Sequence, residues 1–131
     1  MNLIRKAGFL LVCATMVAAG NGTAQNVQRP SQGIKFSAQG MDVNVEFYSP
    51  SIVRVYKTPS QKSCNKESLV IVKTPESTPV SFGEKGKNVT LSSNAIQVEV
   101  NPATGGIHFF DTAGQRLLTD KDYGTQFTPF N

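Results

Sequence analysis

Asp120 and Asp122 are the residues whose types and spacing come closest to a catalytic arrangement. Two carboxyl groups can divide general-acid and general-base work when their surroundings separate their pKa values. In an extended segment the two would share a face and lie about 6.5–7 Å apart. Lys121 lies between them, and nothing nearby supplies an apolar pocket that would raise the pKa of one carboxyl group. We therefore expect both to be solvated and turn-forming, and we predict no catalytic residue in this chain.

The single histidine and the loop cysteine are the other candidates for chemistry. His108 lies between two apolar residues of an alternating segment, so its side chain should point to the opposite, surface side of a strand. One histidine without a cluster of cysteine or acidic residues cannot form a zinc site, so we predict no metal and no cofactor. Cys64 is flanked by Lys62 and Lys66, which could lower its pKa. No histidine lies near it in sequence to act as a base, so we interpret it as an incidental loop residue.

The elements that must position these residues are β-strands. From Ala95 to Leu118, apolar and polar residues alternate with period two, as in a strand with one buried face. The turn at 101–106 contains Pro and two Gly, and Asp111–Gly114 forms a second turn in which Asp111 should bond its own backbone. This stretch predicts three consecutive antiparallel strands and an all-β protein.

The rest of the chain repeats this pattern in shorter pieces. We expect further strands at 34–38, 41–48, 52–57, 69–73, 80–82 and 88–92, with a turn at Gly83–Gly86 and the longest loop at 58–68. Eight or nine short strands with regular turn signals and no helical periodicity predict an antiparallel β-sandwich or barrel.

The tyrosines are candidates for contact with a carbohydrate. We expect Tyr48, Tyr56 and Tyr123 to be exposed, where their rings could stack on a sugar ring.

The N-terminal residues have the layout of an export signal. Arg5 and Lys6 precede an apolar run at 7–19, which is short for a membrane span, and Gly22–Ala24 resembles a signal-peptidase site. We expect a signal peptide at 1–24, a linker at 25–32 and one domain at 33–131, hence a periplasmic or secreted protein with no membrane span after cleavage. An uncleaved anchor is the alternative.

The charge of the expected mature chain excludes one class of partner. Without Arg5 and Lys6, 11 basic residues face 9 acidic ones, a net charge of +2. The positive residues are scattered between Arg29 and Lys121 and do not form a basic stripe with interleaved aromatics. We therefore predict no nucleic-acid partner.

Aromatic residues gather near the C-terminus. Tyr123, Phe127 and Phe130 fall within the last nine residues, and Phe110 is adjacent to Phe109 so that the two must face opposite sides of a sheet. Such side chains bury about 150–250 Å² each when packed. Either they fold back on the edge of the sandwich, or they meet a partner outside it.

Three blocks carry a resemblance to a known family. The N-terminal domain of glycoside hydrolase family 31 enzymes resembles this chain in the segment Phe47–Val55 and in the meander at 97–118. The block Asp120–Phe127 is similar to the versions found in exported bacterial enzymes of that family. The resemblance spans roughly Gly33 to Asn131. It implies a galactose-mutarotase-like β-sandwich that precedes a catalytic (β/α)₈ barrel acting on α-linked glucosides or xylosides.

The resemblance also implies that catalysis belongs elsewhere in the parent enzyme. Retaining glycosidases use two carboxylates about 5–5.5 Å apart, and in this family both come from the barrel. A barrel needs about 250 residues, more than this chain offers, so the chain is expected to be a truncated domain that is inactive alone. The implied partner is that barrel, with Phe110, Tyr123, Phe127 and Phe130 as interface residues, and α-glucoside or xyloside oligosaccharides are candidate ligands.

Two alternatives remain open from the residues. A free-standing carbohydrate-binding module would have measurable affinity for sugars and a hydrophilic C-terminal edge. A structural envelope protein would bind neither sugars nor a barrel.

Overall fold

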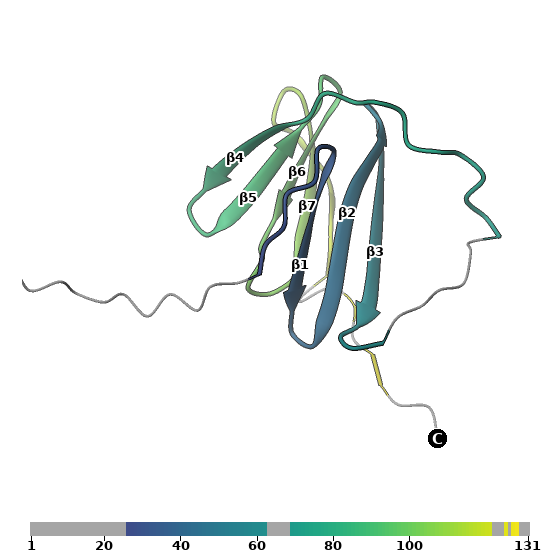
Figure 1. Cartoon of the computed structure of the whole chain (residues 1–131). Helices are drawn as coiled ribbons and strands as arrows, with labels where there is room; N and C mark the ends of the chain where they lie inside the picture. Colours follow the sequence, from purple (N-terminus) through teal and green to yellow (C-terminus); the bar gives the residue numbers. More distant parts are fainter. Residues whose placement is uncertain (1–25, 63–68, 122–124, 126, 129–131) are drawn as a thin grey trace, which may run out of the picture.

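The computed structural model describes residues 26–62, 69–121, 125, 127 and 128, and in them it forms two antiparallel sheets that face each other (Figure 1). The described residues contain no helix, hence none able to cross a membrane. The prediction of an all-β antiparallel sandwich is confirmed. The expected signal peptide at 1–24, Cys64, Asp122, Tyr123 and Phe130 lie outside the described residues.

The first sheet, sheet A, has the order β1-β2-β3. Its strands are β1 (Gly33–Ala38), β2 (Met41–Ser49) and β3 (Ile52–Pro59). Residues alternate between a core-facing set, such as Phe36, Val43 and Lys57 in one cross-strand row, and an outer set. In β3, Val53 and Val55 lie on the core-facing side and Tyr56 lies on the outer side.

The second sheet, sheet B, is a meander of five strands in sequence order. Its strands are β4 (Ser81–Lys85), β5 (Asn88–Ser92), β6 (Ile96–Val100), β7 (Ile107–Asp111) and β8 (Arg116–Thr119). β6, β7 and β8 are the three consecutive antiparallel strands predicted from the alternation. Asp111 holds the β7–β8 turn as expected, because its Oδ1 accepts a hydrogen bond of 2.7 Å from the Gln115 amide.

The core lies between the facing sides of the two sheets. Its buried side chains are those that the alternation places on one face of each strand. Sheet A contributes Ile34, Phe36, Ala38, Met41, Val43, Val45 and Phe47, and sheet B contributes Val89, Leu91, Val98, Val100 and Ile107. β3 and β8 contribute little, because Val55 and Leu118 are 36% and 62% exposed although they lie in core-facing cross-strand rows.

Two local predictions were wrong. The turn between β4 and β5 is at Gly86 and Lys87, and Gly83 lies inside β4. A Cβ at this position would come within 2.7 Å of Thr90 Oγ1 on the neighbouring strand, so a larger residue would require the Thr90 side chain to shift. Residues 69–73 form no strand, because no sheet edge pairs with them, and Leu69 and Val72 are more than nine-tenths exposed.

The segments that flank sheet A are held against it. Residues 69–80 run over the upper ends of β3 and β2 to reach β4 (Figure 1), and the Glu76 amide donates to the Tyr48 carbonyl there. Gln28, in the expected linker, exchanges two backbone hydrogen bonds of 2.8 Å with Lys35 of β1. The strip of residues before β1 therefore lies beside sheet A and extends its surface.

Candidate functional site

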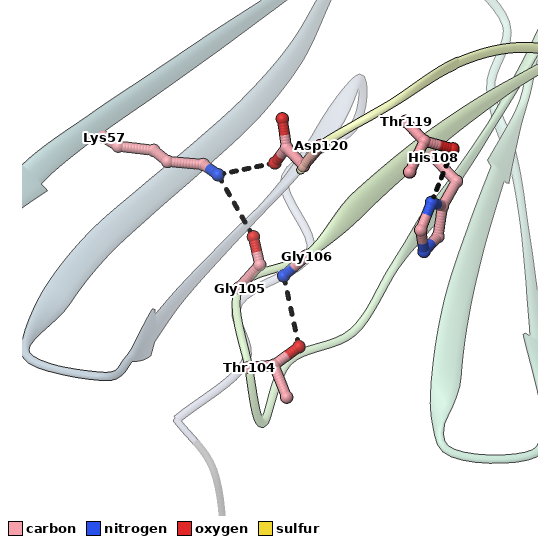
Figure 2. Close-up of polar contacts among 7 residues, drawn as sticks. All are labelled: Lys57, Thr104, Gly105, Gly106, His108, Thr119 and Asp120. Carbon is pink, nitrogen blue, oxygen red and sulfur yellow. Dashed lines mark hydrogen bonds and ion pairs between the residues drawn. The ribbon is translucent and has the colours of Figure 1, made fainter. Parts of the chain in front are cut away.

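Asp120, the described member of the candidate acid pair, forms an ion pair. The Lys57 ammonium lies 2.7 Å from Asp120 Oδ2 and also donates to the Gly105 carbonyl at 3.2 Å (Figure 2). β3 supplies Lys57, the β6–β7 turn supplies Gly105, and Asp120 directly follows β8. The Asp120 amide donates to the Ile107 carbonyl at 3.0 Å, which fixes the position of its carboxyl group.

This ion pair corrects the expectation that Asp120 is a solvated turn residue. The Lys57 side chain is only 7% exposed and that of Asp120 is 31% exposed. A buried ammonium must have a counter-ion, because burial without one is strongly unfavourable. Asp120 therefore neutralises Lys57 and joins the two sheets at the end of the sandwich, and its carboxylate is engaged in this structural contact.

The β6–β7 turn beside the ion pair is shaped by its own side chains. Asn101 Oδ1 accepts hydrogen bonds from the Ala103 and Thr104 amides, and Thr104 Oγ1 accepts one from Gly106 at 3.2 Å (Figure 2). Gly105 adopts φ +80°, the left-handed region that favours glycine. The turn thus presents the Gly105 carbonyl to Lys57.

His108 lies on the outer side of sheet B, as predicted. Its Nδ1 is 3.1 Å from Thr119 Oγ1, on the neighbouring strand (Figure 2). The described residues contain no group of three or more His, Cys, Asp or Glu side chains placed to hold a metal ion. In this setting the imidazole makes a cross-strand surface contact.

Glu99 is a buried acid that our sequence analysis did not single out. It lies opposite His108 on the outer side of sheet B, and the residue is only 8% exposed. The Asn88 amide donates to Oε1, and the Lys85 ammonium lies 3.3 Å from Oε2. These contacts, chiefly that of Asn88, hold the pKa of Glu99 below its ordinary value against the opposing effect of burial. The alternation gave the face of Glu99 but no signal of its burial.

Phe110 and Phe127 are the described members of the expected interface. Phe110 is partly buried on the outer side of sheet B, where the charged ends of Lys85 and Arg116 lie 5.9 and 5.7 Å from its ring centroid. Phe127 is 46% exposed. Near β7, the β8 residues Leu117 and Leu118 are 56% and 62% exposed. The strand β8 and Phe127 therefore expose large apolar side chains.

A groove of about 320 Å³ lies on the outer side of sheet A. Its floor is made by two cross-strand rows, Lys35–Asn44–Tyr56 and Ser37–Asp42–Thr58, and the strip before β1 forms one wall. Ser37 and Ser60 donate to Asp42 Oδ1 at 2.6 and 3.0 Å, and these bonds lower the pKa of Asp42. Asp42 is therefore a fixed anion at neutral pH.

The three tyrosines predicted to be exposed differ in position. Tyr48 is 7% exposed and its hydroxyl accepts a hydrogen bond of 2.8 Å from Arg54, so the expectation that it is open to a ligand was wrong. The Arg54 guanidinium lies 5.8 Å from the Tyr48 ring centroid, and the Tyr48 carbonyl accepts a hydrogen bond from the Glu76 amide. Tyr56, in contrast, is 37% exposed and lines the groove.

Comparison with known proteins finds that this chain is similar to part of several glycosidases. No protein-family model matches the chain. Alpha-glucosidase 2 of Bacillus thermoamyloliquefaciens is 29% identical over 86 residues, which is 66% of this chain and 11% of that enzyme. The chain thus spans about a tenth of the length of this relative.

Two solved structures share the fold. The GH31 α-xylosidase of Xanthomonas citri matches with a TM-score of 0.72 and 22% identity, over 80% of this chain and 12% of that one. A GH31 α-xylosidase from a soil metagenome, solved with xylose, matches with a TM-score of 0.61 and 20% identity, over 72% and 14%. The resemblance stated from the sequence is confirmed, because the proteins that match this chain in sequence and in structure include GH31 enzymes. The all-β structure fits an N-terminal β-sandwich domain of such an enzyme.

Proposed function

We propose that this chain is the non-catalytic N-terminal β-sandwich domain of an exported, retaining α-glycosidase of glycoside hydrolase family 31. In this role it packs on the catalytic (β/α)₈ barrel of the same protein and shapes access to the substrate, an α-glucoside or α-xyloside. The observation that carries the proposal is the match to the X. citri α-xylosidase, which covers 80% of this chain but only 12% of that enzyme.

The acids in the described residues support a non-catalytic role. A retaining glycosidase needs two carboxylates about 5–5.5 Å apart around the scissile bond. Asp120 is paired with Lys57 and Glu99 with Asn88 and Lys85, so each carboxylate is satisfied by a structural partner. Asp42 is held by two serine hydroxyls. The pKa values of Glu99 and Asp42 are both lowered, which is the opposite of what a general acid requires.

The exposed apolar side chains of β8 and Phe127 support a packing role. Leu118 faces the interior side of sheet B but remains 62% exposed, and Phe127 is 46% exposed. Large apolar side chains exposed in this way are typical of a site covered by another part of a protein. Together with Phe110, Tyr123 and Phe130, these residues form the interface that we propose for the barrel.

An assay of the purified chain tests the proposal. We expect no hydrolysis of aryl α-glucosides or aryl α-xylosides above the level of a mock purification. Asp120→Asn, prepared in parallel, is the matched control, because it removes the candidate acid with little change in shape. Turnover by the wild-type chain that disappears in Asp120→Asn would overturn the non-catalytic assignment.

Export is tested separately by expression in a Gram-negative host. We expect the chain in the periplasmic fraction with a new N-terminus near Gln25, identified by N-terminal sequencing. Retention of Met1 in the membrane fraction would instead support the anchor alternative.

A further inference from the structure

We propose that the groove on the outer side of sheet A is a binding site for an uncharged saccharide. This site lies on the face of sheet A that points away from sheet B, whereas the interface proposed for the barrel lies at β7, β8 and the C-terminal segment. The choice of a saccharide over other uncharged polar ligands rests on the proposed function. The size, polar groups, aromatic surface and charge of the groove are independent of it.

The size of the groove fits a short chain of sugar rings. Lys35, Asn44 and Tyr56 lie directly opposite one another on β1, β2 and β3, with Ser37, Asp42 and Thr58 in the next outer row. Neighbouring strands are about 4.8 Å apart, so each row is about 10 Å long, comparable to two linked sugar rings. The groove volume of about 320 Å³ is in the lower range of ligand pockets.

The polar groups of the floor are available to a ligand. Among the described residues, the side chains of Lys35 and Asn44 make no hydrogen bond, although Asn44 is partly buried. An amide both donates and accepts, which matches the hydroxyl groups of a sugar. Asp42 accepts two serine hydroxyls through Oδ1 and a backbone hydrogen bond from Gln61, and a carboxylate has about four lone-pair sites in all, so it can accept one more donor. The floor therefore offers a donor, an acceptor and an amide within one short stretch.

Tyr56 supplies the apolar surface that a sugar ring needs. The Arg54 guanidinium lies 5.3 Å from its ring centroid and also donates to Tyr48, which anchors the guanidinium against β2. Tyr56 lines the groove, whereas Arg54 does not. The ring therefore has a fixed neighbour outside the groove and presents surface within it, where the C–H face of a sugar can pack.

The charges of the groove favour a ligand without net charge. Lys35 and the ionised Asp42 are its charged side chains, and they cancel. An anionic polymer would approach Asp42 and a cationic one Lys35, so either would meet a like charge. Asn26 and Gln28 add two further amides at the wall that is fixed by the Gln28–Lys35 backbone bonds.

Calorimetric titration of the full chain tests this site. The probes are maltohexaose and a xyloglucan heptasaccharide as uncharged ligands, and an oligogalacturonate as an anionic comparison. We expect at least one uncharged probe to bind, and Tyr56→Ala and Asn44→Ala each to weaken binding about tenfold, which corresponds to about 1.4 kcal/mol. Gln97→Ala, on the outer side of sheet B, is the matched control and should bind as the wild type does.

Two controls separate a loss of sugar binding from a loss of folding and from the proposed domain role. Each variant is first checked by denaturant unfolding, and if Tyr56→Ala does not fold, then Asn44→Ala and Lys35→Ala decide. Lack of binding by every uncharged probe, binding of the anionic probe alone, or binding that Asn44→Ala and Lys35→Ala leave unchanged would each overturn the saccharide site. The hydrolysis assay is independent, so a chain that neither binds nor hydrolyses refutes this site and leaves the proposed domain role intact.

Discussion

The Lys57 ammonium and the Asp120 carboxylate lie 2.7 Å apart and link β3 of sheet A to the end of β8 in sheet B. The residue that most resembled a catalytic acid in the sequence is therefore the counter-ion of a buried lysine. Lys57 occupies a core-facing position in the same cross-strand row as Val43 and Phe36. A charge at such a position is tolerated because Asp120 and the Gly105 carbonyl both reach it.

Unequal burial of the two partners predicts unequal costs of removing them. Asp120→Ala leaves an ammonium that is 7% exposed without a counter-ion, and we expect a loss of about 2–3 kcal/mol in the free energy of unfolding. Lys57→Met leaves a carboxylate that water can reach, and we expect a loss of about 1 kcal/mol. Urea unfolding followed by circular dichroism measures both.

The double variant provides the control for this pair. Lys57→Met combined with Asp120→Ala should be more stable than Asp120→Ala alone, since the unpaired buried charge is gone. Simple additivity of the two losses would contradict the interpretation that the ion pair couples the two sheets.

The sequence predicted the fold more completely than the candidate site, because the alternation of residues reports which face of a strand a side chain lies on but not which distant side chains it contacts. Alternation with period two assigns each residue to a face, and this was sufficient for the core and for the β6–β8 meander. It does not show which distant segments meet, so the contact between Lys57 and Asp120, 63 positions apart, could not be foreseen. Neither could the burial of Tyr48, whose carbonyl bonds the amide of the distant residue Glu76.

The prediction of strands failed where the local composition of a segment did not match its pairing with neighbouring strands. Residues 69–73 have the β-branched composition of a strand, but a strand also needs a paired edge, and they pair with none of the described strands. The prediction at Gly83 failed in the opposite sense: a glycine, which is typical of turns, lies inside β4, where an added Cβ would meet the Thr90 hydroxyl.

Glu99 should make the stability of the domain dependent on pH. Its pKa is lowered in the folded state, so its contribution is present above the pKa of the unfolded chain and is lost as the pH falls through the folded pKa. Between about pH 6 and pH 3 the wild type should lose about 1 kcal/mol more than Glu99→Gln, which keeps the shape but cannot ionise. Unfolding free energies at four pH values measure this difference, and parallel pH profiles would exclude the role of Glu99.

Two glycines should respond differently to the same added methyl group. At Gly33 a Cβ would lie 2.2 Å from the Val45 carbonyl oxygen, an atom of the β2 backbone that cannot rotate away. Gly33→Ala should therefore cost about 2–3 kcal/mol of unfolding free energy by forcing β1 from β2. Gly40 has φ +73° but open space around it. Gly40→Ala should therefore lower the free energy of unfolding by only about 1 kcal/mol, the cost of a left-handed backbone conformation for a residue with a Cβ. Equal losses in the two variants would argue against the β1–β2 contact as described.

The exposed apolar segment at 69–72 should matter for association and not for folding. Leu69 and Val72 are 96% and 93% exposed, whereas Leu91 is fully buried in the core. The double variant Leu69→Ser, Val72→Ser should leave the unfolding free energy within about 0.5 kcal/mol of the wild type, while Leu91→Ala should cost about 3 kcal/mol. Short apolar β-prone segments at a surface promote self-association, so light scattering at high concentration should show less aggregation of the serine variant. A large loss of stability in that variant would mean that these side chains are packed in solution, contrary to their exposure here.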